Sequence, residues 1–356
     1  MAQTSLSSPP ITSSKKTRHT GPLRPGSAAR VFFTLFLVVY AVVTLIPFYF
    51  LFIRSFVPTK ASTQLHLWIP KPEEISMDSQ LGNLATFYKI DLTGFKREMG
   101  IQGYINSSLT LREIAQDFNV PEDKMKAYFQ NYITYNGIYA IFSGGNFISH
   151  VAGTVFIALA SIIFGGFLGL ATGSVLAGLR KRWHTWVYYL YLLQIAIAPI
   201  MIILPTYLIM TRVLNLYDSY LALILLYVKG GALSTMVFTT YAATIPVDLR
   251  ESVEIDGGNL PTYFFRVLLP LAKTPFAVYA SISLPVIWND LLNGFLFLSP
   301  DKFTVIPLVN AFTGTFATNL QATYSGLLFA TVPLLVVYLV FQRLFVRSAL
   351  AGAVKG

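Results

Sequence analysis

One stretch of the chain decides the fold class: it reads VAGTVFIALASIIFGGFLGLATGSVLAGL, covers residues 151–179 and carries no charged side chain. About 20 such residues span the hydrocarbon core of a bilayer as a helix, at a rise of about 1.5 Å each. The rest of the 356-residue chain has the same character, since 54% of it is hydrophobic and only 12% is charged. Soluble domains carry about 25% charged residues. The composition therefore excludes an ordinary soluble protein, and it also excludes a disordered chain.

Five further runs resemble the first, and two of them contain a single charge each, Lys229 and Asp290. These runs are 31–53, 185–211, 219–247, 274–300 and 321–342. We therefore predict an all-α, polytopic membrane protein with six transmembrane helices. Buried core helices of a large soluble protein are the alternative, but six long runs with so few charges disfavour it.

The basic residues predict how these spans are oriented, because cytoplasmic segments are enriched in Lys and Arg. If the N-terminus is cytoplasmic, the whole formal charge of +10 falls on the cytoplasmic side. That side then comprises 1–30, 180–184, 248–273 and 343–356. We expect both termini to be cytoplasmic. Residues 1–30 are rich in Ser, Thr and Pro, which predicts a disordered basic tail, and 31–53 is read as an uncleaved first span.

Residues 54–147 have the composition of a soluble segment and are predicted to lie outside the cytoplasm. Thr110 and Glu113 have the spacing of a capping box, and apolar residues follow at helical intervals on both sides of Pro121. Two helices with a tight connection resemble a helix-turn-helix, for which DNA would be the partner. Residues 109–136 carry three basic and four acidic side chains, which does not suit phosphate contacts. We therefore predict a helical cap and no nucleic-acid binding.

The loop between the fourth and fifth runs has a pattern of its own, LRESVEIDGGNLPTYFFRVLLPL over 249–271. A short polar helix is expected to end at Gly257, since glycine readily adopts φ > 0 at a helix C-terminus. Asn259 can cap a second helix, and Pro261 fits its first turn. Two short amphipathic helices at an angle would form a rigid knob that transmits force to a soluble partner. A simple connecting loop is the alternative.

This loop resembles the "EAA" signature of binding-protein-dependent ABC importer permeases. The signature is carried here by Glu251, Glu254, Asp256-Gly257-Gly258, Val267 and Leu269-Pro270, with Ser252 and Val253 in place of its two alanines. Trp288-Asn289 and the C-terminal segment 341–356 are similar to carbohydrate-uptake permeases, in particular those of the second maltose-permease subunit type. The resemblance covers about 31–56 and 148–356. The outer insert and the basic tail depart from the family's pattern.

The resemblance implies a core permease domain over 148–356, with five transmembrane helices and the coupling loop 248–273. It implies no covalent chemistry in this chain and no bound cofactor; ATP and Mg would belong to two separate ATPase subunits. The other partners would be a second homologous permease, an extracytoplasmic substrate-binding protein and membrane lipid. The setting would be the inner membrane of a bacterial or archaeal cell. The transported solute would be a carbohydrate, by preference an oligosaccharide, although relatives also carry polyols and sugar phosphates.

Roles for single residues follow from the same resemblance. The ATPase-coupling residues would be Glu251, Glu254, Asp256, Gly257, Gly258, Leu269 and Pro270. Gly314 and Thr315 would contact the binding protein. Polar side chains that could line a translocation path are Tyr188, Tyr191, Gln194, Lys229, Trp288, Asn289, Asp290 and Asn293. For each of these, helix packing is the alternative. Lys229 and Asp290 are expected at similar depth, either as an ion pair or with separate polar neighbours.

Other classes of function fit less well. A secondary transporter or a channel for a small polar solute is the main alternative, but only two charges lie within the predicted spans, which is few for ion coupling. The sequence has no cysteine, and its four histidines lie far apart. It therefore offers no thiol nucleophile, no histidine pair at metal-ligand spacing and no motif of an intramembrane enzyme.

Overall fold

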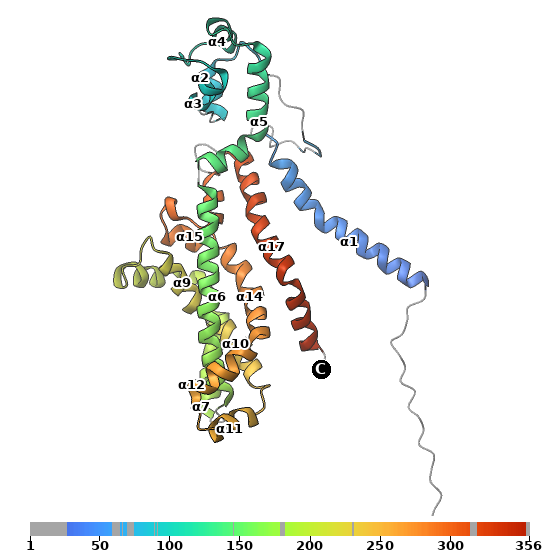
Figure 1. Ribbon diagram of the computed structural model, residues 1–356, viewed down its shortest axis with the longest axis vertical. Coiled ribbons are helices and arrows are strands. Elements are labelled where there is room, and N and C mark those ends of the chain that lie inside the picture. Colours follow the sequence, from blue (N-terminus) through green and yellow to red (C-terminus); the bar gives the residue numbers. More distant parts are fainter. Residues whose placement is uncertain are drawn as a thin grey trace, which may run out of the picture. The chain divides into compact units, whose positions relative to one another are not determined.

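The computed structural model describes residues 27–58, 65, 67–69, 75–88, 90, 92–144, 146–178, 182–229, 231–313 and 319–353. These residues are almost entirely helical, and the β-structure among them is a single bridge between Gln80 and Thr110. The helices, coloured along the chain in Figure 1, are α1 (Ser27–Arg54), α2 (Leu81–Tyr88), α3 (Leu92–Met99), α4 (Leu111–Asp117), α5 (Glu122–Gly144), α6 (Phe147–Gly178), α7 (Arg182–Ala196), α8 (Ile203–Leu208), α9 (Tyr220–Lys229), α10 (Ala232–Ala242), α11 (Asp248–Ile255), α12 (Leu260–Tyr263), α13 (Leu269–Leu271), α14 (Lys273–Trp288), α15 (Leu292–Phe297), α16 (Val305–Ala311) and α17 (Leu320–Ala353). The predicted all-α class is confirmed.

The chain divides into two compact units, one up to Tyr49 and one from Phe50 onward. The first unit contains most of α1, an apolar helix that has no charged side chain between Arg30 and Arg54. Its apolar length of 26 residues is enough to cross a bilayer. The predicted span 31–53 therefore corresponds to one helix.

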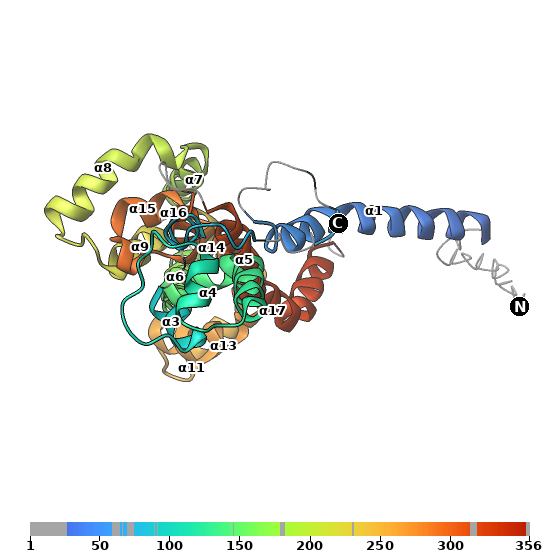
Figure 2. The ribbon, with the colours of Figure 1, turned by 90° about the horizontal axis from the view of Figure 1, so that it is seen from above.

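The centre of the second unit is α6, the 32-residue helix that contains the run quoted above. It packs against α9, α10 and α14, and α14 also packs against α17 (Figures 1 and 2). Close packing with α10 depends on a small residue, because a Cβ on Gly173 would lie 2.6 Å from the backbone nitrogen of Thr239. Small residues let helices approach closely where lipid gives no hydrophobic drive for association.

Three helices of the described chain are long and apolar enough to cross a membrane, and up to six crossings exist if each of three bent helix pairs counts as one. The single helices are Ala29–Arg54, Phe147–Gly178 and Leu320–Val340. The bent pairs are Trp183–Ala196 with Pro199–Val213 (97°), Tyr220–Lys229 with Ala232–Ala242 (49°), and Leu260–Leu271 with Lys273–Trp288 (67°). The six-span topology and its orientation stay predictions.

Three of the predicted runs are interrupted helices. The run 185–211 breaks before Pro199, a residue that disfavours helix in the residue preceding it. The run 219–247 breaks between Lys229 and Ala232. The run 274–300 was expected to be one helix and is not, because α14 ends at Trp288 and α15 begins at Leu292. Apolar composition predicts that a segment lies in the membrane, but the points at which its helix is interrupted depend on single residues.

The insert, residues 54–147, contains a hydrophobic core of its own between Met77 and Phe129, distinct from the core around α6. Its largest fully buried side chains include Phe95 and Phe129, whose ring centroids lie 5.5 Å apart. The predicted capping box is present, since Thr110 and Glu113 exchange side-chain and backbone hydrogen bonds at the start of α4. Glu122–Gly144 forms the helix predicted after Pro121, but at 23 residues it is much longer than expected. The division of the chain at 54 and 147 stays a prediction.

Candidate functional site

The polar helix of the loop 249–271 is α11, and it ends as the sequence predicts. Gly257 adopts φ +78°. The Gly258 amide donates to the Val253 carbonyl at 2.8 Å, and the Gly257 amide donates to the Glu254 carbonyl at 3.1 Å. These two bonds form a Schellman motif, which satisfies carbonyls left free at the end of the helix. The chain therefore turns sharply at a defined angle.

The second helix of the loop begins at the predicted cap. The Asn259 side-chain oxygen accepts from the Thr262 amide at 3.0 Å and from the Thr262 hydroxyl at 2.8 Å, and Pro261 stands in the first turn. From Phe264 to Leu268 the helix widens into a π-helical segment, η4, before α13. The predicted pair of short helices is confirmed.

Two contacts attach this second helix to α10 and α6, which belong to the predicted membrane spans. The Tyr241 hydroxyl at the end of α10 donates to the Leu271 carbonyl at 2.7 Å. The ring of Phe264 lies 5.3 Å, centroid to centroid, from that of Phe167 in α6. Leu268 of the loop is buried in the core around α6. The loop is therefore attached to α6 and α10 by packed and hydrogen-bonded groups.

The acidic residues of α11 differ in their surroundings. Glu254 accepts from Arg250 at 2.9 Å, an ion pair between residues four apart. Glu251 is exposed, and its carboxylate has no hydrogen-bond or ion-pair partner among the described residues. Next to these charges stands Ile255, with 85% of its surface exposed. Asp256 and Pro270 are exposed and Leu269 is half-buried. The loop thus offers an unpaired carboxylate beside an uncovered apolar side chain.

The possible ion pair between Lys229 and Asp290 does not form in this structure, since no contact within 4.0 Å joins them among the described ion pairs. The Lys229 ammonium instead donates to the Thr206 hydroxyl at 3.0 Å. Asp290 accepts from the Tyr227 hydroxyl at 2.8 Å and from the Asn293 side-chain amide at 2.6 Å. The alternative, in which each charge has its own polar neighbour, is the arrangement found.

Both charges lie at helix breaks. Lys229 ends α9, where a positive charge is favoured by the helix dipole. Asp290 precedes α15, and its carboxylate accepts from the backbone amide of Asn293, in the first turn of that helix, at 3.1 Å. Such discontinuous helices carry substrate and ion sites in membrane transporters. Here they place polar groups at two points along otherwise apolar runs.

The remaining path residues are not gathered at one surface. Trp288 is buried, and its indole nitrogen donates to the Ala330 carbonyl of α17 at 3.1 Å, so this side chain serves helix packing in the present conformation. Asn289 is exposed and donates to its own helix at Pro285. On α7, one face carries the half-buried side chains of Tyr188, Tyr191 and Gln194. Gly314 and Thr315 lie outside the described residues.

Sequence reasoning missed two features of these sites. The partner of Asp290, Tyr227, lies 63 positions away in the chain, and no local pattern connects the two. The pairing of Arg250 with Glu254 could have been predicted from the four-residue spacing on a helix. Within the described residues, no group of three or more His, Cys, Asp or Glu side chains could hold a metal ion.

Comparison with known proteins identifies the family of this helical unit. Residues 165–350 match the family described as binding-protein-dependent transport system inner membrane component. The melibiose/raffinose/stachyose import permease MelC of Bacillus subtilis (strain 168) is 29% identical over 215 residues, which are 60% of this chain and 76% of that protein. The trehalose transport system permease SugB of Mycobacterium tuberculosis (strain CDC 1551 / Oshkosh) is 28% identical over 228 residues, 63% of this chain and 83% of its own.

A solved structure shares the fold. It is a bacterial ABC transporter involved in the import of the acidic polysaccharide alginate, with a TM-score of 0.57 and 15% identity, and the match covers 90% of this chain and 98% of the other. Because the family match covers more than half of the chain and includes the whole loop 249–271, the protein is a multi-pass membrane permease of the binding-protein-dependent transport system inner membrane component family.

Proposed function

We propose that this chain is the permease subunit of an ATP-driven importer, and that it moves a carbohydrate, by preference an oligosaccharide, into the cytoplasm. The rigid loop 249–271 carries the proposal, because it offers a free Glu251 carboxylate and an exposed Ile255 on a knob that is tied to two helices of the span region. Relatives named for melibiose, raffinose and stachyose, for arabinooligosaccharides and for trehalose support the class of substrate.

The proposed mechanism follows from how the loop is held. An ATPase subunit would receive the knob in a surface cleft, with Glu251 as the polar contact, Ile255 as the apolar one and Gly257 as the turn that sets the angle between the helices. Closure of two ATPase subunits around ATP would displace the knob. The contacts at Tyr241 and Phe167 would carry that displacement to α10 and α6. Access to the path would then alternate between the two sides of the membrane.

Further partners complete the proposal. A second, homologous permease would supply the other half of the path, and a substrate-binding protein would deliver the solute from outside. We assign the insert 54–147 to that outer side as added docking surface, since it is charge-balanced and has its own core. Deleting the insert and finding an unchanged affinity for the binding protein would show that it shields the outer face instead.

Charge reversal at Glu251 tests the coupling role. Glu251→Lys should reduce ATP-driven uptake on the order of tenfold or more, because repulsion replaces an attraction at a polar contact. Membrane insertion and association with the second permease should persist, as measured by co-purification. The matched control is Asp301→Lys, a reversal at an exposed carboxylate outside the insert whose side chain has no partner among the described residues. Normal uptake by Glu251→Lys would contradict the assignment.

A further inference from the structure

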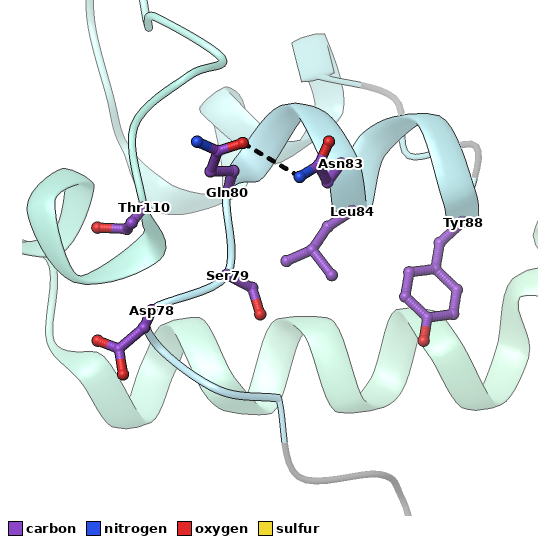
Figure 3. A pocket seen from close by; sticks show the side chains of 7 residues that line it. All are labelled: Asp78, Ser79, Gln80, Asn83, Leu84, Tyr88 and Thr110. Carbon is purple, nitrogen blue, oxygen red and sulfur yellow. Dashed lines mark hydrogen bonds between the residues drawn. The ribbon is translucent and has the colours of Figure 1, made fainter.

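The outer insert contains a hollow of about 530 Å³ that the permease mechanism does not use. Its walls come from the segment before α2, from α2 itself and from the cap of α4 (Figure 3). The polar lining consists of Asp78, Ser79, Gln80, Asn83, Tyr88 and Thr110. Leu84 adds an apolar surface among these groups. Ligand sites of proteins have volumes of about 300–1,000 Å³ and combine apolar surface with a few placed polar groups, which this hollow also does.

Three polar side chains of the hollow, Ser79, Gln80 and Asn83, retain donors or acceptors that no described residue uses. Gln80 accepts from the Asn83 side-chain amide at 3.1 Å, which fixes both amide groups. This bond uses one atom of each side chain, so Gln80 keeps a free NH₂ group and Asn83 a free carbonyl oxygen. The Ser79 hydroxyl has no partner among the described residues. Asp78 holds Arg112 through one oxygen at 3.1 Å.

The walls are held in place by the core of the insert. The Leu111 amide donates to the Ser79 carbonyl and the Leu81 amide to the Leu109 carbonyl, both at 3.0 Å, on either side of the bridge between Gln80 and Thr110. Leu81 and Leu111 are both buried in the insert core. Because backbone bonds and burial fix this wall, little ordering is needed when a ligand enters.

The chemistry of the lining selects the class of ligand. A sugar hydroxyl both donates and accepts, and the hollow offers a free donor on Gln80 beside free acceptors on Asn83 and Asp78. The apolar face of a sugar ring can pack on Leu84 and Tyr88. Among the described residues that line the hollow none is basic, so a phosphate or carboxylate group would find no cationic side chain in this lining.

We propose that this hollow is a carbohydrate-binding subsite for one end of a neutral oligosaccharide. The subsite rests on the proposed function, because it would retain the sugar beside the permease while the binding protein delivers it. The hollow is shallow and its polar groups are partly exposed, so the expected dissociation constant is on the order of 1 mM. Such weak binding allows the sugar to leave for the path.

Hydrogen–deuterium exchange of the assembled transporter in lipid nanodiscs tests the subsite. The probes are raffinose and maltose at about ten times the expected dissociation constant, with proline as a control solute. Exchange in peptides over 76–88 and 107–113 should slow by about tenfold, because opening then requires release of the sugar. The double variant Gln80→Ala with Asn83→Ala should lose this protection. Gln102→Ala, a matched change at an exposed amide outside the hollow, should keep it.

Two further measurements keep the result interpretable. Exchange of the double variant without sugar should equal that of the wild type, which shows that the insert is folded. Gln80→Glu retains an oxygen for Asn83 but loses the free donor, so it should also lose protection. No protection by either sugar in the wild type, or equal protection in the double variant, would overturn the subsite. If ATP-driven sugar uptake is normal in that case, only the subsite fails; if the transporter takes up no sugar, the proposed function fails.

Discussion

Gly257 and Gly258 are adjacent, yet the structure requires glycine at the two positions for different reasons. A Cβ on Gly257 would meet nothing within 4 Å, but the backbone there has φ +78°. Gly258 has no such φ, but a Cβ on it would lie 2.6 Å from the Val253 side chain and 2.9 Å from the Val253 carbonyl oxygen. The first position is restricted by backbone conformation and the second by space.

The two glycines should therefore tolerate different replacements. Gly257→Val should cost about 1–2 kcal/mol, because a β-branched residue resists positive φ, and Gly257→Asn should recover most of that loss. At Gly258 even alanine should impair uptake. Its methyl group would collide with Val253, so the hydrogen bond from the residue 258 amide to the Val253 carbonyl would have to lengthen. Thermal unfolding and uptake, measured on the same preparations, check both. Equal tolerance of Val and Asn at Gly257 would contradict the conformational argument.

Asp218 is a second residue whose role depends on its local geometry. It adopts φ +58°, its carboxylate accepts from the Ser299 amide at 2.9 Å, and it pairs with Lys302 at 2.9 Å. The backbone hydrogen bond from Ser299, followed by the bond from Lys302, lowers the pKa of Asp218 to about 2. These contacts tie the turn before α9 to the segment after α15.

This pKa predicts how the stability of that tie depends on pH. An unperturbed aspartate has a pKa of about 3.9. The folded-state value is lower, so the stabilisation is complete above about pH 4 and is lost as the pH falls toward about 2. Asp218→Asn removes the charge but leaves a residue that tolerates a positive φ. It should lower the melting temperature at neutral pH, and the difference from wild type should shrink below about pH 4. Asp301→Asn, at an exposed neighbour, is the control; a pH-independent difference at Asp218 would contradict the prediction.

At the scale of elements, α5 belongs to two cores. Met125 and Phe129 in its first half are buried in the insert, whereas Ile141 in its second half is buried in the core around α6. Between them, the buried Gln321 of α17 donates to the carbonyls of Ile133 at 3.1 Å and Thr134 at 2.7 Å. The insert is thus joined to the last long helix by a continuous helix and a buried amide.

The loss of this amide should loosen α5 from α17. Gln321→Ala removes both donated bonds and leaves two carbonyls without this donor, so it should destabilise the protein by about 1–3 kcal/mol. Gln342→Ala is the matched control, because Gln342 donates only to Leu339 of its own helix. Thermal unfolding with limited proteolysis of the insert measures the effect. An unchanged melting temperature for Gln321→Ala would show that the amide contributes no net stability.

The helix breaks show what the sequence could and could not predict. Long apolar runs predicted the class of fold and the positions of α1, α6 and α17, because hydrophobic length is a strong signal, whereas the 23-residue helix α5 of the insert was not predicted at its full length. The coupling loop was also predictable, since a Schellman turn, an Asn cap and a proline are all local signals. The roles of Lys229 and Asp290 were not, because their partners Thr206 and Tyr227 come from elsewhere in the fold.

For the molecule as a whole, most of the proposed path could not be located from sequence. Trp288 is an aromatic residue on which a sugar ring could stack, but its side chain packs against α17. The hollow of the insert depends on residues that lie about 30 positions apart and meet only through the bridge between Gln80 and Thr110. Contacts of this kind are determined by tertiary packing, so a single sequence gives no periodic signal for them.

The central claim is that ATP hydrolysis by partner subunits, passed through the loop 249–271, drives sugar uptake. The most direct test is accumulation of labelled raffinose by proteoliposomes that contain the whole transporter and its binding protein, with ATP on the ATPase side and ionophores that collapse ion gradients. We predict uptake that requires ATP and is insensitive to ionophores. Uptake that continues without ATP and stops with ionophores would contradict the account and favour a secondary transporter.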